Sequence, residues 1–277
     1  METRKLALLN LLIVCINFTW ILYIDSKALF GNSLYRMFSL YPTHLTPADF
    51  TFKIWLMVGF SMMFVSWLMY RETGGQQRNP RMIMKVKKID YLLILNQLFC
   101  GMSMVMKLNE YHIVSVFFSV LCLITLLIIN QRLEIHKLTS NSFTKYFIRL
   151  SFGLYTGWLL CVFAFNFVTI FVKNGVIESE LEQYIVDLGV ICLTFAFAMY
   201  YSVIKLLPTV SMSFSWGLFG ILYQNWQQPA YDNYPILVPL IVLFAVGLLA
   251  SGYIFYRCNI KRVPGKVMEP RNSTSIP

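Results

Sequence analysis

The side chains of this chain that could do chemistry are mainly amides and aromatic rings. Asn96 and Asn166 interrupt long apolar runs, and Trp55 and Trp158 lie in similar surroundings. An amide in an apolar environment needs hydrogen-bond partners, so it either ties helices together, the commoner use, or binds the polar edge of a ligand. Flat aromatic walls suit flat apolar ligands, but packing alone explains a buried Trp equally well. The residue types leave both interpretations open.

Groups for acid–base, covalent or metal chemistry are few and scattered. Of the three His residues, His44 and His136 fall in loops that the topology below places on opposite sides of a membrane. Lys53, Lys107 and Asp187 lie near the ends of apolar runs, where we interpret them as interfacial residues. The six Cys residues form no CxxC pair. We therefore expect no acid–base pair, no metal site, no cofactor and no enzymatic activity.

The elements that carry these residues are predicted to be membrane-spanning helices. Hydrophobic residues make up 57% of the 277 positions, charged residues only 13%, and the mean hydropathy is +0.62. About 20 apolar residues cross a bilayer as a helix, which satisfies its own backbone hydrogen bonds. The sequence predicts an all-α polytopic bundle of eight such helices, at residues 5–24, 50–70, 91–108, 111–130, 148–172, 184–204, 208–226 and 234–256.

The distribution of charge predicts the orientation of the bundle. Most of the 23 Lys and Arg residues cluster near position 4 and in the segments 71–88, 132–149, 205 and 257–271. With eight spans, all of these segments face the same side, which the positive-inside rule identifies as the cytoplasm. Both termini are therefore expected to be cytoplasmic, in a multi-pass protein of the plasma membrane. The net charge of +10 is explained by topology and anionic lipid rather than by nucleic acid.

Two segments outside the spans have distinctive compositions. The external loop of residues 25–49 is rich in aromatic and turn residues, and we expect it to fold back over the bundle. Residues 261–277 contain Pro, Gly, Asn and Ser, and are expected to form a disordered cytoplasmic tail.

Several short motifs occur in the order found in one known membrane-protein family. Residues 46–55 read TPADFTFKIW, residues 30–32 read FGN, and residues 154–158 read LYTGW, with Asn166 eight positions after the Trp. Together with Asn17 and Asn96, this order resembles the tryptophan-rich sensory protein group, which is related to the translocator protein (peripheral benzodiazepine receptor) family. The resemblance covers about residues 5–172.

The resemblance implies a five-helix unit at 1–172, followed by three additional spans at 173–260. It also implies a pocket for a porphyrin or another flat tetrapyrrole, or for a sterol-like lipid, beneath the first external loop. In that pocket aromatic rings would stack on the ligand and two amides would orient it. The ligand-binding residues expected from the resemblance are Phe52, Trp55, Asn96, Tyr155, Trp158 and Asn166.

A sensory or regulatory binding protein is therefore the favoured interpretation, and two others stay open. One is a transporter of a hydrophobic small molecule, although the halves of the chain show no convincing repeat. The other is a scaffold that docks a partner membrane protein through small-residue faces around Gly220 and Gly247. The expected partners are the lipid bilayer and a hydrophobic ligand, and a homodimer is left open.

Overall fold

The computed structural model describes residues 2–25, 31, 33–74, 78–135, 143–227 and 236–259, whose regular elements are all helices. The predicted tail at 261–277 lies outside the described residues. Each of the eight predicted runs corresponds to one long helix. These helices are α1 (Glu2–Asp25), α3 (Ile54–Glu72), α5 (Leu92–Leu108), α6 (His112–Arg132), α7 (Phe143–Lys173), α8 (Glu180–Lys205), α9 (Pro208–Gln227) and α10 (Leu237–Asn259).

Three further helices are short: α2 (Leu34–Ser39), the 3-10 helix η1 (Asp49–Lys53) and α4 (Pro80–Ile89). Helices α2 and α4 were not expected from the hydropathy runs, whereas η1 forms the start of the run predicted at 50–70. Helix α4 begins where the Asn79 side chain accepts a hydrogen bond from the Arg81 N–H, with Pro80 at the first helical position. It ends at Asp90, whose φ of +51° breaks the helix before α5 starts. Helices α4 and α5 consequently meet at a bend of 48°.

Six of the described helical segments are long and apolar enough to cross a membrane, and a seventh qualifies if α4 and α5 form one bent span. Helix α9 is not among them because small and polar residues interrupt its 20-residue sequence. Several of these residues are buried between neighbouring helices, namely Ser211, Ser213, Ser215 and Asn225. The helical membrane bundle is thus confirmed, while the count of eight spans and the sidedness of the termini stay predictions.

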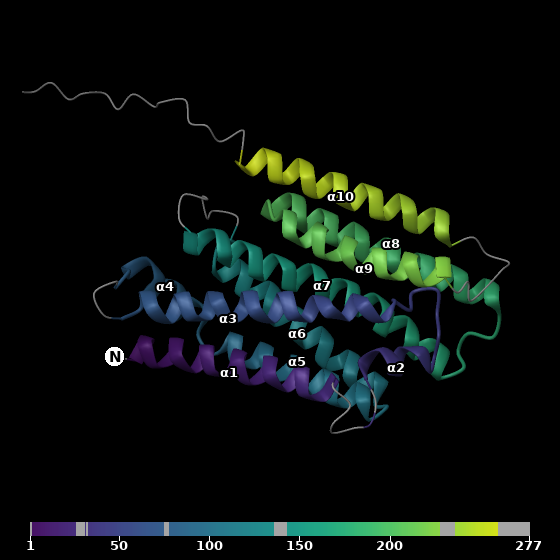
Figure 1. Cartoon of the computed structure of the whole chain (residues 1–277), viewed down its shortest axis with the longest axis horizontal. Helices are drawn as coiled ribbons and strands as arrows, with labels where there is room; N and C mark the ends of the chain where they lie inside the picture. The colour runs from purple at the N-terminus through teal and green to yellow at the C-terminus, as the bar shows by residue number, and fades with distance from the viewer. Residues whose placement is uncertain are drawn as a thin grey trace, which may run out of the picture.

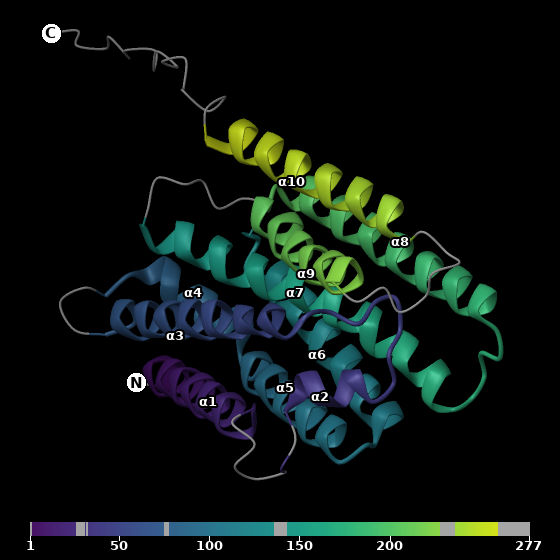
Figure 2. The ribbon, with the colours of Figure 1, turned by 45° about the vertical axis from the view of Figure 1, so that its right-hand side comes forward.

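The long helices run side by side along one axis of the molecule (Figure 1). Helices α1, α3, α5, α6 and α7 form one part of the bundle, and α8, α9 and α10 pack together on its α7 side (Figures 1 and 2). The first turn of α1, helix α4 and the end of α10 lie at one end of the bundle, and α2 lies at the other. Most basic residues of the described helices belong to the first of these ends.

Close packing of α7 and α9 joins the two parts. A Cβ atom placed on Gly157 would lie only 2.1 Å from the Val210 carbonyl oxygen, and one on Gly217 would lie 2.1 Å from the Cys161 Sγ. Only glycine allows the helices to approach this closely. Gly220 lies similarly against Thr51, and Gly247 of α10 against Ser215. The small-residue faces that suggested a partner protein are therefore used for contacts within the chain.

Candidate ligand-binding site

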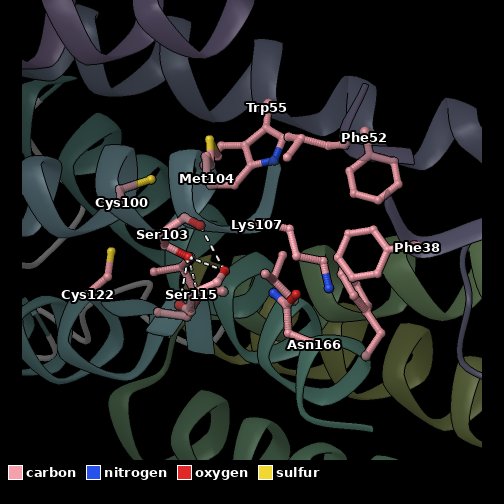
Figure 3. A pocket seen from close by; sticks show the side chains of 15 residues that line it. Phe38, Phe52, Trp55, Cys100, Ser103, Met104, Lys107, Ser115, Cys122 and Asn166 are labelled. Carbon is pink, nitrogen blue, oxygen red and sulfur yellow. Dashed lines mark hydrogen bonds between the residues drawn. The ribbon is translucent and has the colours of Figure 1, made fainter. Parts of the chain in front are cut away.

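A small cavity lies inside the bundle near the end that carries α2 (Figure 3). The space in it that is open to the centre of a water molecule is about 40 Å³, and one water needs roughly 10–15 Å³ on this measure. The cavity is bounded by α2, η1, α3, α5, α6 and α7. Its lining residues are Leu34, Phe38, Phe52, Trp55, Cys100, Ser103, Met104, Lys107, Ser115, Ser119, Cys122, Leu159, Val162, Phe165 and Asn166.

Aromatic rings form one side of the cavity. Phe38 of α2 stacks on Phe52 of η1 with ring centroids 5.6 Å apart, and Trp55 follows on α3. Trp158 lies behind them, edge-on to Phe52 at 6.2 Å and to Trp55 at 6.1 Å. These edge-to-face contacts fix the orientation of the rings that face the cavity.

Asn166 supplies an amide oxygen that has no partner in the described part of the chain. Its side chain lines the cavity and is 4% exposed, and its Oδ1 atom accepts no hydrogen bond from any described residue. A buried amide normally forms hydrogen bonds, because an unsatisfied one costs about 1–3 kcal/mol. Asn166 is therefore available to bind a polar group inside the cavity.

Lys107 adds a basic group to the lining. Its Nζ lies 2.9 Å from the His112 Nδ1 atom and 4.1 Å from the centroid of the Phe38 ring. The side chain is only 3% exposed, so Lys107, although it lies near the end of α5 as expected, does not extend to the surface of the protein. The sequence did not indicate that Lys107 lines a cavity, because a Lys near a helix end usually extends towards water. Here α2 folds over that end of α5 and encloses the side chain (Figure 3).

Serine hydroxyls complete the polar part of the lining. The Ser103 and Ser119 Oγ atoms lie 2.6 Å apart, and the Ser103 hydroxyl also donates to the Ser115 carbonyl oxygen over 3.0 Å. The Ser115 hydroxyl in turn donates to the Ser103 carbonyl oxygen over 2.8 Å. These bonds join α5 to α6 and satisfy the hydroxyl groups within the protein.

Of the six residues expected to bind a ligand, Phe52, Trp55 and Asn166 line this cavity, and Asn96, Tyr155 and Trp158 lie outside its lining. Asn96 ties α5 to α6, since its Nδ2 donates to the Cys122 carbonyl oxygen over 2.7 Å and to the Thr125 hydroxyl over 3.1 Å. The Tyr155 hydroxyl lies 3.3 Å from the Cys122 Sγ. Tyr155 also borders, together with Trp55, a separate gap of about 20 Å³ next to α1.

We call residues 34–53, which comprise α2, a connecting loop and η1, the cover segment. Its residues Leu34, Phe38 and Phe52 close one side of the cavity. The expectation that the external loop folds back over the bundle agrees with this arrangement. The segment is held in place by the C-terminal helices rather than by the helices around the cavity alone.

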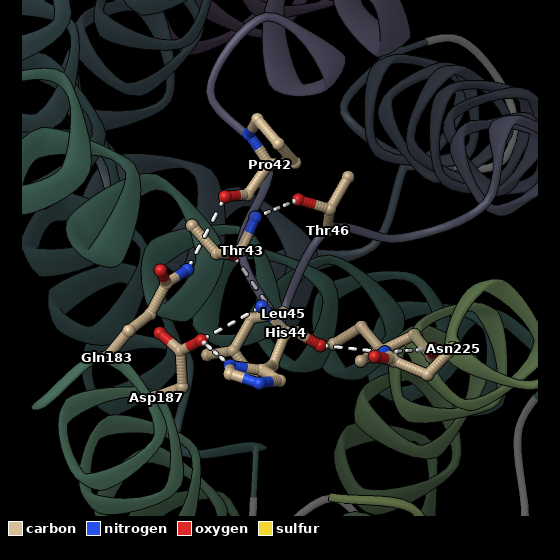
Figure 4. Close-up of polar contacts among 9 residues, drawn as sticks. Pro42, Thr43, His44, Leu45, Thr46, Gln183, Asp187 and Asn225 are labelled. Carbon is tan, nitrogen blue, oxygen red and sulfur yellow. Dashed lines mark hydrogen bonds and ion pairs between the residues drawn. The ribbon is translucent and has the colours of Figure 1, made fainter. Parts of the chain in front are cut away.

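The firmest of these attachments is a buried pair between His44 and Asp187 (Figure 4). The His44 backbone N–H donates to Asp187 Oδ2 over 2.9 Å, and the ring Nδ1 lies 2.8 Å from the same oxygen. Both side chains are almost fully buried, at 1% and 0% exposure. The sequence interpretation that no acid–base pair forms is therefore wrong, because the loop and α8 come together only in the folded bundle.

Further hydrogen bonds fasten the cover segment to α8 and α9. The Asn225 Nδ2 of α9 donates to the His44 carbonyl oxygen over 2.8 Å, and the Gln183 Nε2 of α8 donates to the Pro42 carbonyl oxygen over 3.4 Å (Figure 4). The Trp216 indole N–H donates to the Thr51 carbonyl oxygen over 3.0 Å. Helices α8 and α9 thus position the segment that covers the cavity.

Long apolar helices arranged around a small internal cavity define a multi-pass integral membrane protein. The family model for TSPO-like proteins matches residues 7–255, and the chain belongs to that family. The match spans both the first five predicted helices and the three that follow. Searches of curated proteins and of solved structures gave no match.

Proposed function

We propose that the protein binds a small hydrophobic ligand in the cavity between α2, η1, α3, α5, α6 and α7. The observation that supports this most strongly is Asn166, a buried amide that faces a mostly apolar cavity and whose Oδ1 atom has no described hydrogen-bond partner. Phe38, Phe52 and Trp55 would contact the apolar body of the ligand, and Asn166 would bind its polar group. Asn96, Tyr155 and Trp158 would support these residues from behind.

The size of the cavity implies that binding changes the shape of the protein. Sites for drug-sized ligands typically occupy about 300–1,000 Å³, far more than the space seen here. We propose a flat tetrapyrrole such as a porphyrin as the ligand class, with sterol-like lipids as an alternative. A ligand of this size therefore requires the cover segment to move outward. Such a movement couples ligand binding to the outer surface of the protein, which suits a sensory or regulatory role.

Transport of a hydrophobic molecule is the second candidate function. A transporter needs a second opening towards the opposite side of the membrane. The described residues that line the cavity include neither such an opening nor a broken helix. The small-residue faces no longer support a docking scaffold, because Gly220 and Gly247 pack against Thr51 and Ser215 of the same chain. Binding therefore remains the better-supported function.

The test is a fluorescence titration of the detergent-purified protein with protoporphyrin IX and with cholesterol. We expect saturable binding of protoporphyrin, weakened about tenfold or more in Asn166→Leu because the ligand loses a buried hydrogen bond. The matched control is Met57→Leu, a change at an exposed position of α3 that should leave the affinity unchanged. If neither compound binds the wild-type protein saturably, the proposed function is wrong.

A further inference from the structure

Lys107 has no carboxylate partner among the described residues, although its side chain is almost completely buried. The contacts of its ammonium group are the His112 ring nitrogen and the face of the Phe38 ring. The described residues form two salt bridges, His44–Asp187 and Lys88–Glu134, and neither involves Lys107. Buried charges in proteins are normally paired, because removing a charge from water is costly.

The surroundings of Lys107 supply hydrogen-bond donors and positive charge rather than acceptors. When Lys107 is protonated its Nζ only donates, so the His112 Nδ1 atom then accepts from it and the ring proton lies on Nε2. That Nε2 is buried and has no partner among the described residues. Lys173 adds a second ammonium group nearby, close enough to repel that of Lys107. Within the described part of the chain this region therefore brings two lysines close together, and Lys107 has no carboxylate partner there.

This charge lies at the cavity and not on the surface. Lys107 and Asn166 both line the cavity, on α5 and α7 respectively, and Figure 3 shows the Lys107 side chain extending between Phe38 and Asn166. A carboxylate that entered the cavity could accept from the Lys107 ammonium group, while a donor elsewhere on the ligand could reach the Asn166 Oδ1, which has no described partner. Charge-assisted hydrogen bonds of this kind are about twice as strong as neutral ones.

We propose that the ligand of this cavity is an apolar molecule that carries a carboxylate, and that Lys107 pairs with this group. The inference rests on the proposed function and narrows its ligand class: acidic tetrapyrroles satisfy it, whereas a sterol, which has only a hydroxyl group, does not. The contacts with Phe38 and His112 hold the ammonium group in position while the cavity is empty.

The test compares protoporphyrin IX with its dimethyl ester, which keeps the flat ring and lacks the two charges. Wild-type protein should bind the free acid about tenfold or more tightly than the ester, since loss of one partner of a buried charge pair is costly. The Lys107→Met variant keeps the length of the side chain without its charge, and should bind acid and ester equally. Lys107→Arg keeps the charge and should retain the preference for the acid.

Each outcome separates this inference from the proposed function. If the wild-type protein binds acid and ester equally while Asn166→Leu weakens both, the cavity binds ligand but the carboxylate inference is overturned. Retention of the preference for the acid in Lys107→Met overturns it as well. If the wild-type protein binds neither compound, both proposals are overturned. The comparison of acid and ester in the wild type tests the inference even if Lys107→Met does not fold.

Discussion

Asn96 and Asn166 are amides of the same type with different surroundings in the bundle. Asn96 donates to the Cys122 carbonyl oxygen and to the Thr125 hydroxyl, and its Oδ1 accepts from the Gln97 Nε2 over 3.1 Å. Gln97 in turn accepts from Asn17 over 2.8 Å, so a row of amides joins α1, α5 and α6. Asn166 has an unsatisfied oxygen instead. The Asn96 amide therefore stabilises the fold, whereas the unsatisfied Asn166 oxygen destabilises it.

Leucine at these two positions is therefore expected to change stability in opposite directions. Asn166→Leu removes a buried unsatisfied group and should raise the thermal unfolding midpoint, corresponding to about 1–3 kcal/mol. Asn96→Leu leaves the buried Gln97 Nε2 without its acceptor and breaks the tie to α6, so it should lower the midpoint. Thermal unfolding in detergent, followed by circular dichroism, measures both. If Asn166→Leu destabilises the protein as much as Asn96→Leu, Asn166 has a structural partner and is not a ligand contact.

The sequence predicts that these amides are buried but not which of them is satisfied, because the partners of Asn96 lie on another helix. Lys107 shows a related limit. It follows Asn96, Cys100 and Ser103 at helical spacing, so the buried face of α5 was visible in the sequence. Helix α2 encloses this face as far as Lys107, and hydropathy does not predict this six-residue helix.

At the scale of elements, the cover segment connects the cavity to the C-terminal helices. Its loop is bonded to α8 through His44 and Asp187, and to α9 through Asn225. Helices α8 and α9, two of the three C-terminal helices whose role the sequence left open, thus hold the cover segment in place. The long helices could be predicted from hydropathy because each is a continuous apolar run. This attachment could not, since His44 and Asp187 are 143 residues apart.

A double-mutant cycle tests the attachment. His44→Leu and Asp187→Leu should each destabilise the protein by about 3–5 kcal/mol, because each leaves a buried polar or charged group without its partner. The double variant should lose clearly less free energy of unfolding than the two single variants lose together, since both polar side chains are then gone. Denaturation in detergent measures the three variants against the wild type. Additive effects would show that the two residues do not act as a pair.

At the scale of the whole molecule, the protein is a helical membrane bundle of the TSPO-like family whose cavity lies among the first five long helices. Helix α9, with its buried serines and glycines, packs between this part and α10. Hydropathy and the resemblance predicted the bundle and its family, and they included Phe52, Trp55 and Asn166 among the site residues. The space between the helices depends on side-chain packing across six elements, which no local pattern encodes.

The central claim is that ligand binds inside this cavity, and filling the cavity tests it most directly. Ser119 lines the cavity, and Ser119→Leu places a larger apolar side chain there while the hydroxyl of Ser103 keeps its bond to the Ser115 carbonyl oxygen. Cys192→Leu, at an exposed position of α8, is the matched control. By fluorescence titration with protoporphyrin IX, we predict that Ser119→Leu loses about tenfold or more in affinity and that the control binds like the wild type. Unchanged affinity in a correctly folded Ser119→Leu protein would contradict the account.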